Sequence, residues 1–492
     1  MKNIYIYILA TILSLFLCPN LLSQVNQKTI TLDEVVGTLS LESTSAKIER
    51  LNFQNDLLQF ENYKKSFLPS FSFNVNPVNF NRSLRVLQKP DDGSYSYVED
   101  YSNNSNWGIT VNQKIGWTGG ELNIGSRLNY LSEFSQNRNS FSTSPFTIGY
   151  SQQFWGGRKT YRIERDIQYA RNKVSIKKYC SKLSDIQQST LNIFMVVLLN
   201  KLESELQCRN KEINDTLLYI SKTKLANGNI TEFDFRQIEL QSLNTQYAYE
   251  NAMKSYEEAL QRLQTYLALE ENIRILVPVF DLPLSLDGYT VASYVKENNP
   301  FSVEQYIAKL EAEEALHSVK LNSRFNGTVS LNYGINQYAE NLVEAYRHGN
   351  TQQSVVIGLQ IPIFQWGINK NKIRIARNNY QVSLLNMENS QREFDNTIRE
   401  KVNNYNRSVR LWLVAEKSYQ ISQQQYGMLA QKFALGKVSV YELTAARQDQ
   451  DTAMQQYYTA VKEAYAEYYS LRHLALFDFK SEKGLESIFI KN

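Results

Sequence analysis

Histidine, cysteine and proline are scarce in this chain of 492 residues, which contains 3, 3 and 9 of them. The histidines are isolated from one another, and the cysteines show no CxxC spacing, so the sequence predicts no metal-ligand cluster. It also lacks a glycine loop of the kind that binds phosphate. We therefore expect no catalytic residue, no cofactor and no metal, and we do not predict an enzyme.

Charge is nearly balanced, and this excludes another class of function. The net charge is +4 including the N-terminal segment, and no clustered basic surface of the kind that nucleic-acid binding requires is visible. In that segment, Lys2 precedes an apolar run of about 14 residues from Ile4 to Leu17, which is too short to cross a bilayer. We expect a signal peptide over residues 1–23 and export from the cytoplasm. Lipidation of Cys18 is left open, although the preceding Leu17 is bulkier than the usual small residue.

Two cysteines remain in the mature chain, Cys180 and Cys208. If both lie on one helix, they are separated by about 28 residues and roughly 40 Å, far beyond the reach of a disulfide. We expect both to be free and buried.

The rest of the chain repeats one plan twice, which predicts an internally duplicated protein of mixed α and β class. We place the first repeat at residues 24–276, the second at 277–476 and a C-terminal tail at 477–492. In each copy, apolar residues at helical spacing are followed by alternating apolar and polar residues, the pattern of a strand. The alternation predicts strands over about 71–154 and about 328–364.

A stretch without proline follows each strand region. The first, about 158–227, also lacks glycine, and the second, about 369–435, contains only Gly427. We expect each to form one helix of about 70 residues, or about 100 Å. The returning helices are expected over about 231–269 and 439–476. Within the second long helix, a coiled-coil seam is predicted by residues at steps of three, four or seven: Met387, Phe394, Ile398, Val402, Tyr405, Val409, Trp412, Ala415, Tyr419, Tyr426 and Phe433.

Two tight turns are predicted where the long helices end. Gly228 follows Asn227 and Gly436 follows Leu435, and glycine supplies the left-handed conformation needed after a helix cap. The N-caps of the returning helices are expected to be Thr231 and Ser439.

The first repeat holds roughly 48 more residues between its strands than the second. The surplus predicts an extra hairpin at about 107–131, because alternating residues flank the turn sequence WTGG at Trp117–Gly120. Its place inside or outside the sheet stays open. The polar stretches Asp91–Ser105 and Asn137–Ser144 are expected to be exposed loops.

Strands can cross a membrane only in a closed barrel, and the four to six strands expected here are too few to close one comfortably. Several chains must therefore contribute. Short motifs occur in order within the duplicated plan: Leu68-Pro69-Ser70, Gly228, Asn299-Pro300, Pro362-Ile363-Phe364 with Gly367, and Gly436. With the repeat itself, they make essentially the whole mature chain resemble the TolC family of bacterial outer-membrane efflux proteins.

The resemblance implies a homotrimer with a long α-helical coiled-coil barrel and a short transmembrane β-barrel completed by trimerisation. It places the protein in the cell outer membrane, in contact with outer-membrane lipid, with the helical part in the periplasm. The implied function is that of an exit duct for an efflux or type I secretion system, with a periplasmic adaptor protein and an inner-membrane pump as partners.

The resemblance also implies site residues at the periplasmic tip. Glu442 and Asp234 fall on acidic positions after the two turns and are candidates for the pore constriction, while Asn227, Gly228, Leu435 and Gly436 would dock the adaptor. The chain departs from the family pattern at Ala445, Val438 and Ser43-Thr44, and by the extra hairpin of the first copy, which could widen the barrel or sit outside it.

Plainer alternatives remain at this point. An acidic residue in the first turn of a helix stabilises the positive end of the helix dipole without any role in transport. A structural coiled coil spanning the envelope, or an adhesin, would explain the long helices and leave the apolar-faced strands without a purpose.

Overall fold

The computed structural model describes residues 28–88, 93–228, 230–271, 273–323, 326–361, 363–434 and 437–490. The predicted signal peptide, Cys18, Leu435 and Gly436 lie outside these residues. Among the helices in the described ranges, none is long and apolar enough to span a membrane.

The chain separates into two compact units, and each takes residues from both repeats. The helical unit comprises the described residues of Met1–Leu51, Tyr179–Asn299 and Asn396–Asn492, and the sheet unit comprises those of Asn52–Lys178 and Pro300–Asp395. The compact units therefore do not follow the boundary that we drew between the repeats at residue 276.

The long helices and their returning partners are the largest elements. They are α5 (Gly157–Ala226, 70 residues), α6 (Glu232–Leu267, 36 residues), α9 (Ile368–Ala434, 67 residues) and α10 (Val440–Ala475, 36 residues). Their great length agrees with the absence of proline from these stretches, since an interior proline removes a helical hydrogen bond.

In the helical unit these helices lie side by side in the order α6, α5, α10, α9. Asn214 on α5 donates a hydrogen bond of 2.6 Å to the hydroxyl of Thr245 on α6. Two further contacts complete the order. Asn210 on α5 bonds Asp451 on α10 at 3.1 Å, and the ring of Tyr419 on α9 stacks on that of Tyr457 on α10 with centroids 5.7 Å apart. The four helices thus form a single-layered wall rather than a bundle.

The predicted seam of α9 is buried in the helical unit over its middle part, where Ile398, Val402, Tyr405, Val409 and Trp412 lie. The two cysteines lie on α5 and are free. Cys180 is buried, and burial raises the pKa of its thiol to about 12. Cys208 is only half-buried, so the expectation that both are buried holds for one of them.

The opening helix of each repeat is broken at a matching place. In the first copy the break lies between α3 (Ser40–Glu42) and α4 (Thr44–Lys65), and α3 is preceded by α2 (Leu32–Glu34) and the π-helix η1 (Val35–Leu39). In the second copy the break lies between α7 (Gly288–Asn298) and α8 (Phe301–Asn322). Asn299 has an extended backbone because it precedes Pro300, and Ser43 is extended as well. The Ser43 hydroxyl accepts a bond from the Ala46 N–H at 3.3 Å and so caps α4. Ser43 therefore marks in the first copy the same break that Asn299 marks in the second.

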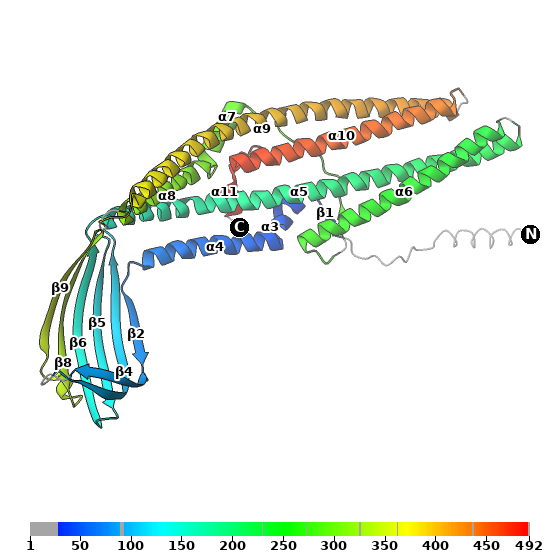
Figure 1. Cartoon of the computed structure of the whole chain (residues 1–492). Helices are drawn as coiled ribbons and strands as arrows, with labels where there is room; N and C mark the ends of the chain where they lie inside the picture. The colour runs from blue at the N-terminus through cyan, green and yellow to red at the C-terminus, as the bar shows by residue number, and fades with distance from the viewer. Residues whose placement is uncertain are drawn as a thin grey trace, which may run out of the picture. The chain divides into compact units, whose positions relative to one another are not determined.

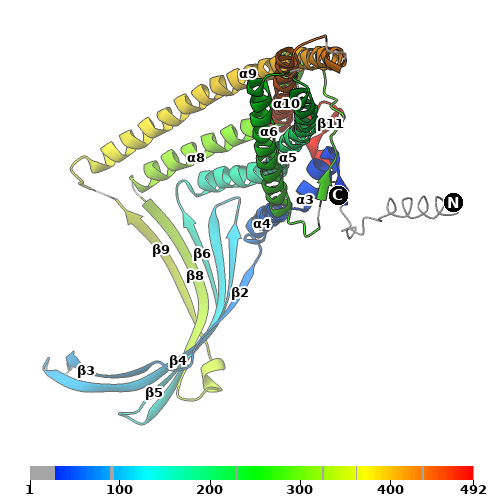
Figure 2. The same cartoon turned by 90° about the vertical axis from the view of Figure 1, so that its right-hand side faces the viewer.

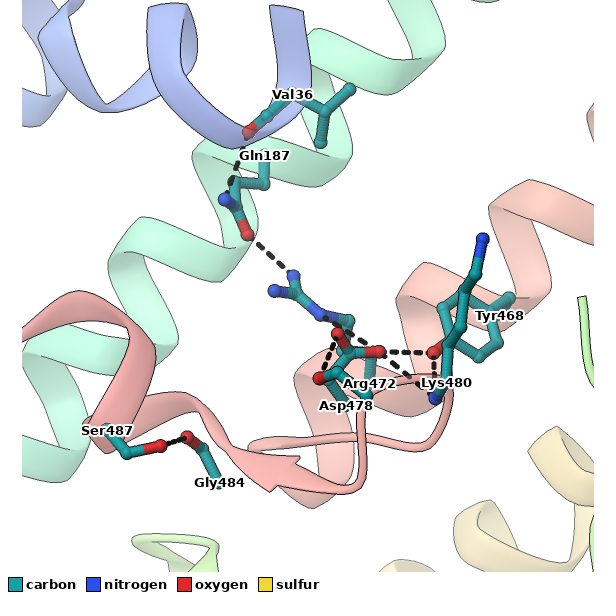
Figure 3. A network of polar contacts seen from close by, with 9 residues as sticks. Val36, Gln187, Tyr468, Arg472, Asp478, Lys480, Gly484 and Ser487 are labelled. Atoms are coloured by element: carbon teal, nitrogen blue, oxygen red, sulfur yellow. Dashed lines mark hydrogen bonds and ion pairs between the residues drawn. The ribbon is translucent and has the colours of Figure 1, made fainter. Parts of the chain in front are cut away.

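Residues 477–490 of the predicted C-terminal tail are packed within the helical unit. They form β10 (Phe477–Asp478), β11 (Lys483–Gly484) and α11 (Leu485–Phe489), and Leu485 and Phe489 are buried in a cluster that includes Cys180. Figure 3 shows the polar contacts beneath them: Arg472 donates to Gln187 at 2.6 Å, and the Tyr468 hydroxyl donates to Asp478. Leu485 and Phe489 are four residues apart on α11, so both side chains lie on the same face of this helix and pack into the cluster together.

A short parallel pair of strands joins the start of the first repeat to its end in the helical unit. These strands are β1 (Lys28–Ile30) and β7 (Ile273–Ile275), and Ile30 and Ile275 are fully buried.

The sheet unit contains one large antiparallel sheet (Figure 1). Its continuous order is β2 (Ser70–Asn76), β4 (Tyr95–Ile115), β5 (Gly120–Glu133), β6 (Arg138–Gln153), β8 (Asn326–Ala339) and β9 (Asn350–Gln360). A further strand, β3 (Phe80–Gln88), pairs with the first part of β4, and in Figure 2 this pair bends away from β8 and β9. The extra hairpin predicted at about 107–131 therefore lies inside the sheet.

The two polar stretches expected to be loops are mostly strand. β4 already begins at Tyr95, within Asp91–Ser105, and β6 begins at Arg138, within Asn137–Ser144. The error came from treating polarity as a sign of missing pairing. Backbone hydrogen bonds to β3 and β5 keep these segments extended. Polar side chains are compatible with a strand wherever the strand does not have to cover an apolar surface.

The helices of the sheet unit lie in the order α4, α5, α8, α9. The rings of Phe60 and Tyr169 meet edge to face at 5.2 Å, Arg171 pairs with Glu311 at 2.7 Å, and further along Phe301 stacks on Phe394 at 4.1 Å. The buried core between α5 and α8 consists of Ile163, Ile167, Ala170, Val174, Ile307 and Leu310.

Candidate functional site

The sheet has one apolar and one polar face, and the strand register defines both. Residues paired directly across strands share a face. One such row runs Val111, Ile124, Ile148 and Tyr333 across β4, β5, β6 and β8. The next row lies on the opposite face and runs Asn112, Asn123, Gly149, Asn332 and Ser354 from β4 to β9. Alternation in the sequence therefore builds two continuous surfaces of opposite character.

The apolar face is open to solvent in the single chain. Phe71 is 76% exposed and Val355 is 69% exposed, although both are large apolar residues. Soluble proteins rarely leave an apolar patch of this extent uncovered. The face is therefore suited to contact lipid.

The polar face is hollowed. It borders a cavity of about 720 Å³ whose lining consists mainly of asparagine, serine, threonine and glycine, with Arg127 as a charged residue. Amide and hydroxyl groups bind water without a strong preference for either sign of charge. Such a surface is suited to a water-filled passage.

Both edges of the sheet are open among the described strands. β2 pairs with β4 alone and β9 with β8 alone. An open edge presents unpaired backbone donors and acceptors to another strand.

The turn between α5 and α6 has the left-handed glycine that the sequence predicted. Gly228 has φ 72°, and its N–H donates to the Leu225 carbonyl at 2.9 Å, while the Asn227 N–H donates to Thr223 at 3.1 Å. An added Cβ at Gly228 would meet nothing within 4 Å, so backbone conformation, not space, calls for glycine here.

The second turn is described from Lys437 onward. The Lys437 N–H donates to the Lys432 carbonyl at 3.0 Å across the turn. Figure 1 shows the α5–α6 and α9–α10 turns at the same end of the helical unit. Their placement at one end makes a joint docking surface feasible.

Glu442 lies in the first turn of α10 and forms a capping box with Ser439. The Ser439 N–H donates to the Glu442 carboxylate at 2.8 Å, and the Ser439 hydroxyl accepts from the Glu442 N–H at 3.3 Å. These bonds to Ser439 lower the pKa of the fully exposed carboxyl below 4.5. Asp234 occupies the corresponding first turn of α6, but its side chain lies outside the described set. Ser439 is the N-cap that the sequence predicted.

A polar layer in the helical wall was not predicted. Asn210 and Asn214 lie one turn apart on α5 and bond Asp451 on α10 and Thr245 on α6. Burial raises the pKa of Asp451. The signal in the sequence was the pair of asparagines four residues apart on α5.

Metal binding has no support in the described part of the chain, where no three His, Cys, Asp or Glu side chains are grouped to hold an ion. Comparison with known proteins identifies the architecture instead. Residues 297–475 match the sequence model of the family described as outer membrane efflux protein. Among curated protein sequences, none matches the chain.

Solved structures match nearly the whole chain. The Campylobacter jejuni CmeC outer membrane channel shares 15% identity, with a TM-score of 0.64, over 94% of this chain and 88% of CmeC. The Vibrio cholerae outer membrane protein VceC shares 12% identity, with a TM-score of 0.61, over 90% of this chain and 95% of VceC. The Neisseria gonorrhoeae MtrE outer membrane channel shares 14% identity, with a TM-score of 0.56, over 90% of this chain and 88% of MtrE.

These comparisons agree with the predicted mixed α and β fold and with the resemblance drawn from the sequence motifs. CmeC and MtrE are described as outer membrane channels. The resemblance to the TolC family is thus confirmed: residues 297–475 match the outer membrane efflux protein model, and the chain as a whole has the fold of these outer-membrane channels.

Proposed function

We propose that this protein is an outer-membrane exit duct of an efflux or type I secretion system, with its sheet in the outer membrane and its helices in the periplasm. The observation that carries the proposal is the two-faced sheet, which combines an exposed apolar surface with a hollowed polar one. Strands in a bilayer must place apolar side chains toward lipid and can line a water-filled lumen with polar ones. The cargo is small molecules or proteins delivered by an inner-membrane pump.

The functional unit is a homotrimer. A membrane-spanning sheet must close, because an unpaired backbone group in lipid costs several kcal/mol. The open edges β2 and β9 support closure by pairing β2 of one chain with β9 of the next. Three copies, the number that the family resemblance implies, would close the ring.

Cell fractionation and detergent extraction test this assembly. We expect the mature chain in the outer-membrane fraction, as a trimer that resists detergent and forms pores in planar bilayers. Recovery as a soluble periplasmic monomer would overturn the proposal. A trimer that forms no pore would favour a structural protein or adhesin.

The periplasmic adaptor docks at the two turns, Asn227-Gly228 and Leu435-Gly436. Support comes from the common location of the α5–α6 and α9–α10 turns at one end of the helical unit. Cross-linking of the trimer to the adaptor through cysteines at Asn227 and Lys437 tests the docking, with Lys254 on the α6 flank as the control position. Equal cross-linking at all three positions would argue against a docking site at the turns.

Glu442 and Asp234 are our candidates for the pore constriction. Three carboxylates brought together on a trimer axis repel one another and favour cations. We expect Glu442→Gln to change the cation selectivity and divalent-cation block of trimers in planar bilayers. Asp234→Asn should affect the leak of the closed state more than ion selectivity. Identical selectivity and block in wild type and Glu442→Gln would leave Glu442 with its capping role alone.

A further inference from the structure

The two repeats supply unequal numbers of strands. The second copy contributes β8 and β9, while the first contributes β2, β4, β5 and β6 to the continuous order of the sheet. We propose that the outer-membrane barrel has eighteen strands, six from each of three chains, and that its mouth admits polar cargo too bulky for a barrel of twelve. This inference rests on the trimeric channel proposed above and adds the size class of its cargo.

The position of the extra hairpin is the first argument. β4 pairs with β2 on one side, from Ser70↔Asn112 to Asn76↔Asn106, and with β5 on the other. β5 in turn pairs with β6 over most of its length. If the hairpin lay outside the barrel, β2 would pair directly with β6. In the structure, β4 and β5 both lie between β2 and β6.

The two faces of the hairpin continue those of its neighbours. Val111 and Ile124 lie between Phe71 on β2 and Ile148 on β6 in the apolar rows. Asn112 and Asn123 hydrogen-bond to each other on the polar face. The hairpin therefore carries the alternation that both lipid and lumen require.

The periplasmic turn of the hairpin is built into the corner between sheet and helix. A Cβ added at Gly119 would lie 2.6 Å from the carbonyl carbon of Gly157, and one at Gly116 would lie 2.5 Å from the hydroxyl of Tyr161. Between them, the Thr118 carbonyl accepts a hydrogen bond of 2.7 Å from Gln152. Such close contacts belong to a fitted part of the barrel base rather than to an appendage.

Strand number sets the width of the barrel. The diameter of a barrel grows roughly linearly with the number of strands, so eighteen strands give about 1.5 times the diameter of twelve. Twelve is the number that three chains would provide if the first copy had only the two strands of the second. The lining of amides and hydroxyls suits hydrated, polar cargo, either large molecules or protein segments.

A deletion variant converts one barrel into the other. Asn76 is level with Ser142 through the pairs Asn76↔Asn106, Asn106↔Asn129 and Asn129↔Ser142. Joining Asn76 to Ser142 by an Asn-Gly turn removes residues 77–141 and sets β2 directly against β6. The rows of both faces stay in register because the bulge of β6 between Thr143 and Phe146 takes up the one extra residue. This variant should give trimers with twelve strands.

The experiment measures how large a reagent can enter the mouth. Ser354→Cys places a thiol on the polar face and Val355→Cys places one on the apolar face of the same strand, in chains whose Cys180 and Cys208 are replaced by serine. Maleimide-polyethylene glycols of graded size are added outside intact cells. We expect Ser354→Cys to react, Val355→Cys to stay protected by lipid, and the largest reactive reagent to shrink to about two-thirds in diameter in the deletion variant.

Strand counting in electron cryo-microscopy images of wild-type trimers in nanodiscs keeps the test decisive if the deletion variant does not fold. Eighteen strands, or a clear drop in the size limit on deletion, would support the inference. Twelve strands, or the same size limit in both proteins, would overturn it while leaving the trimeric channel intact. If the wild-type chain forms no trimer or no pore, the proposed function fails and the eighteen-strand barrel fails with it.

Discussion

The two repeats agree closely in their helices and differ in their strands. The long helices have 70 and 67 residues and the returning helices have 36 each, whereas the first copy places twice as many strands in the continuous sheet as the second. Helices in one wall must cover the same distance, so a length change in one copy would misalign the two turns. A sheet grows sideways, and a hairpin brings the chain back to the level at which it left. Strands can therefore be added in pairs without disturbing the helices.

Gly119→Ala should break this arrangement most severely. Gly119 has φ 73°, which costs a residue with a side chain about 1–2 kcal/mol, and the clash with the Gly157 backbone adds about 1–3 kcal/mol. We expect little stable trimer on detergent gels. The control is Gly108→Ala in β4, whose added Cβ would make an ordinary contact of 3.5 Å with Ser126. Equal trimer yields for both variants would show that the turn is not fitted to the corner.

Gly228→Val tests the comparison at the other end of the helices. A β-branched residue at φ 72° should cost more than about 1 kcal/mol, locally in the α5–α6 turn. We expect loss of efflux, measured as drug sensitivity or retained cargo, while the trimer persists. Gly427→Val is the matched control, because it lies within α9 and an added Cβ there meets nothing within 4 Å. Normal efflux with Gly228→Val would speak against docking at this turn.

Ser43→Ala sharpens the comparison of the opening helices. Loss of the cap should destabilise the start of α4 by about 1 kcal/mol, whereas Asn299→Ala should leave the start of α8 in place because Pro300 still fixes the break. Hydrogen exchange in the first turns of α4 and α8 measures both. Faster exchange in α8 than in α4 would contradict this assignment of roles.

The smallest effect concerns the capping box of α10. The pKa of Glu442 is lowered by its bonds to Ser439, so its contribution to stability is present above the ordinary value of 4.5 and is lost as pH falls through the lower folded-state value. The difference in thermal stability between wild type and Glu442→Gln should therefore vanish in acid. If the difference in thermal stability between the two proteins already changes with pH above 4.5, the pKa of Glu442 is raised instead, as expected for three carboxylates close together in the trimer.

Regular periodicity made most of the fold predictable from the sequence. The proline-free stretches indicated α5 and α9, Gly228 indicated its turn, and alternation indicated the strands. The outer parts of β4 and β6 were missed because most of their residues are polar, and the packing of Leu485 and Phe489 was missed because it depends on residues distant in sequence. The polar layer at Asn210 and Asp451 was missed for the same reason.

The open edges β2 and β9 set a condition on biogenesis. Between export and assembly, each chain carries two strands ready to pair with any extended segment, next to an apolar face that water does not favour. In the proposed trimer, a lone subunit therefore cannot be stored in finished form, because its last backbone hydrogen bonds form only when another copy arrives. Completion of the sheet is a concentration-dependent step, and the time a chain waits for its neighbours is the time during which it is most prone to aggregate.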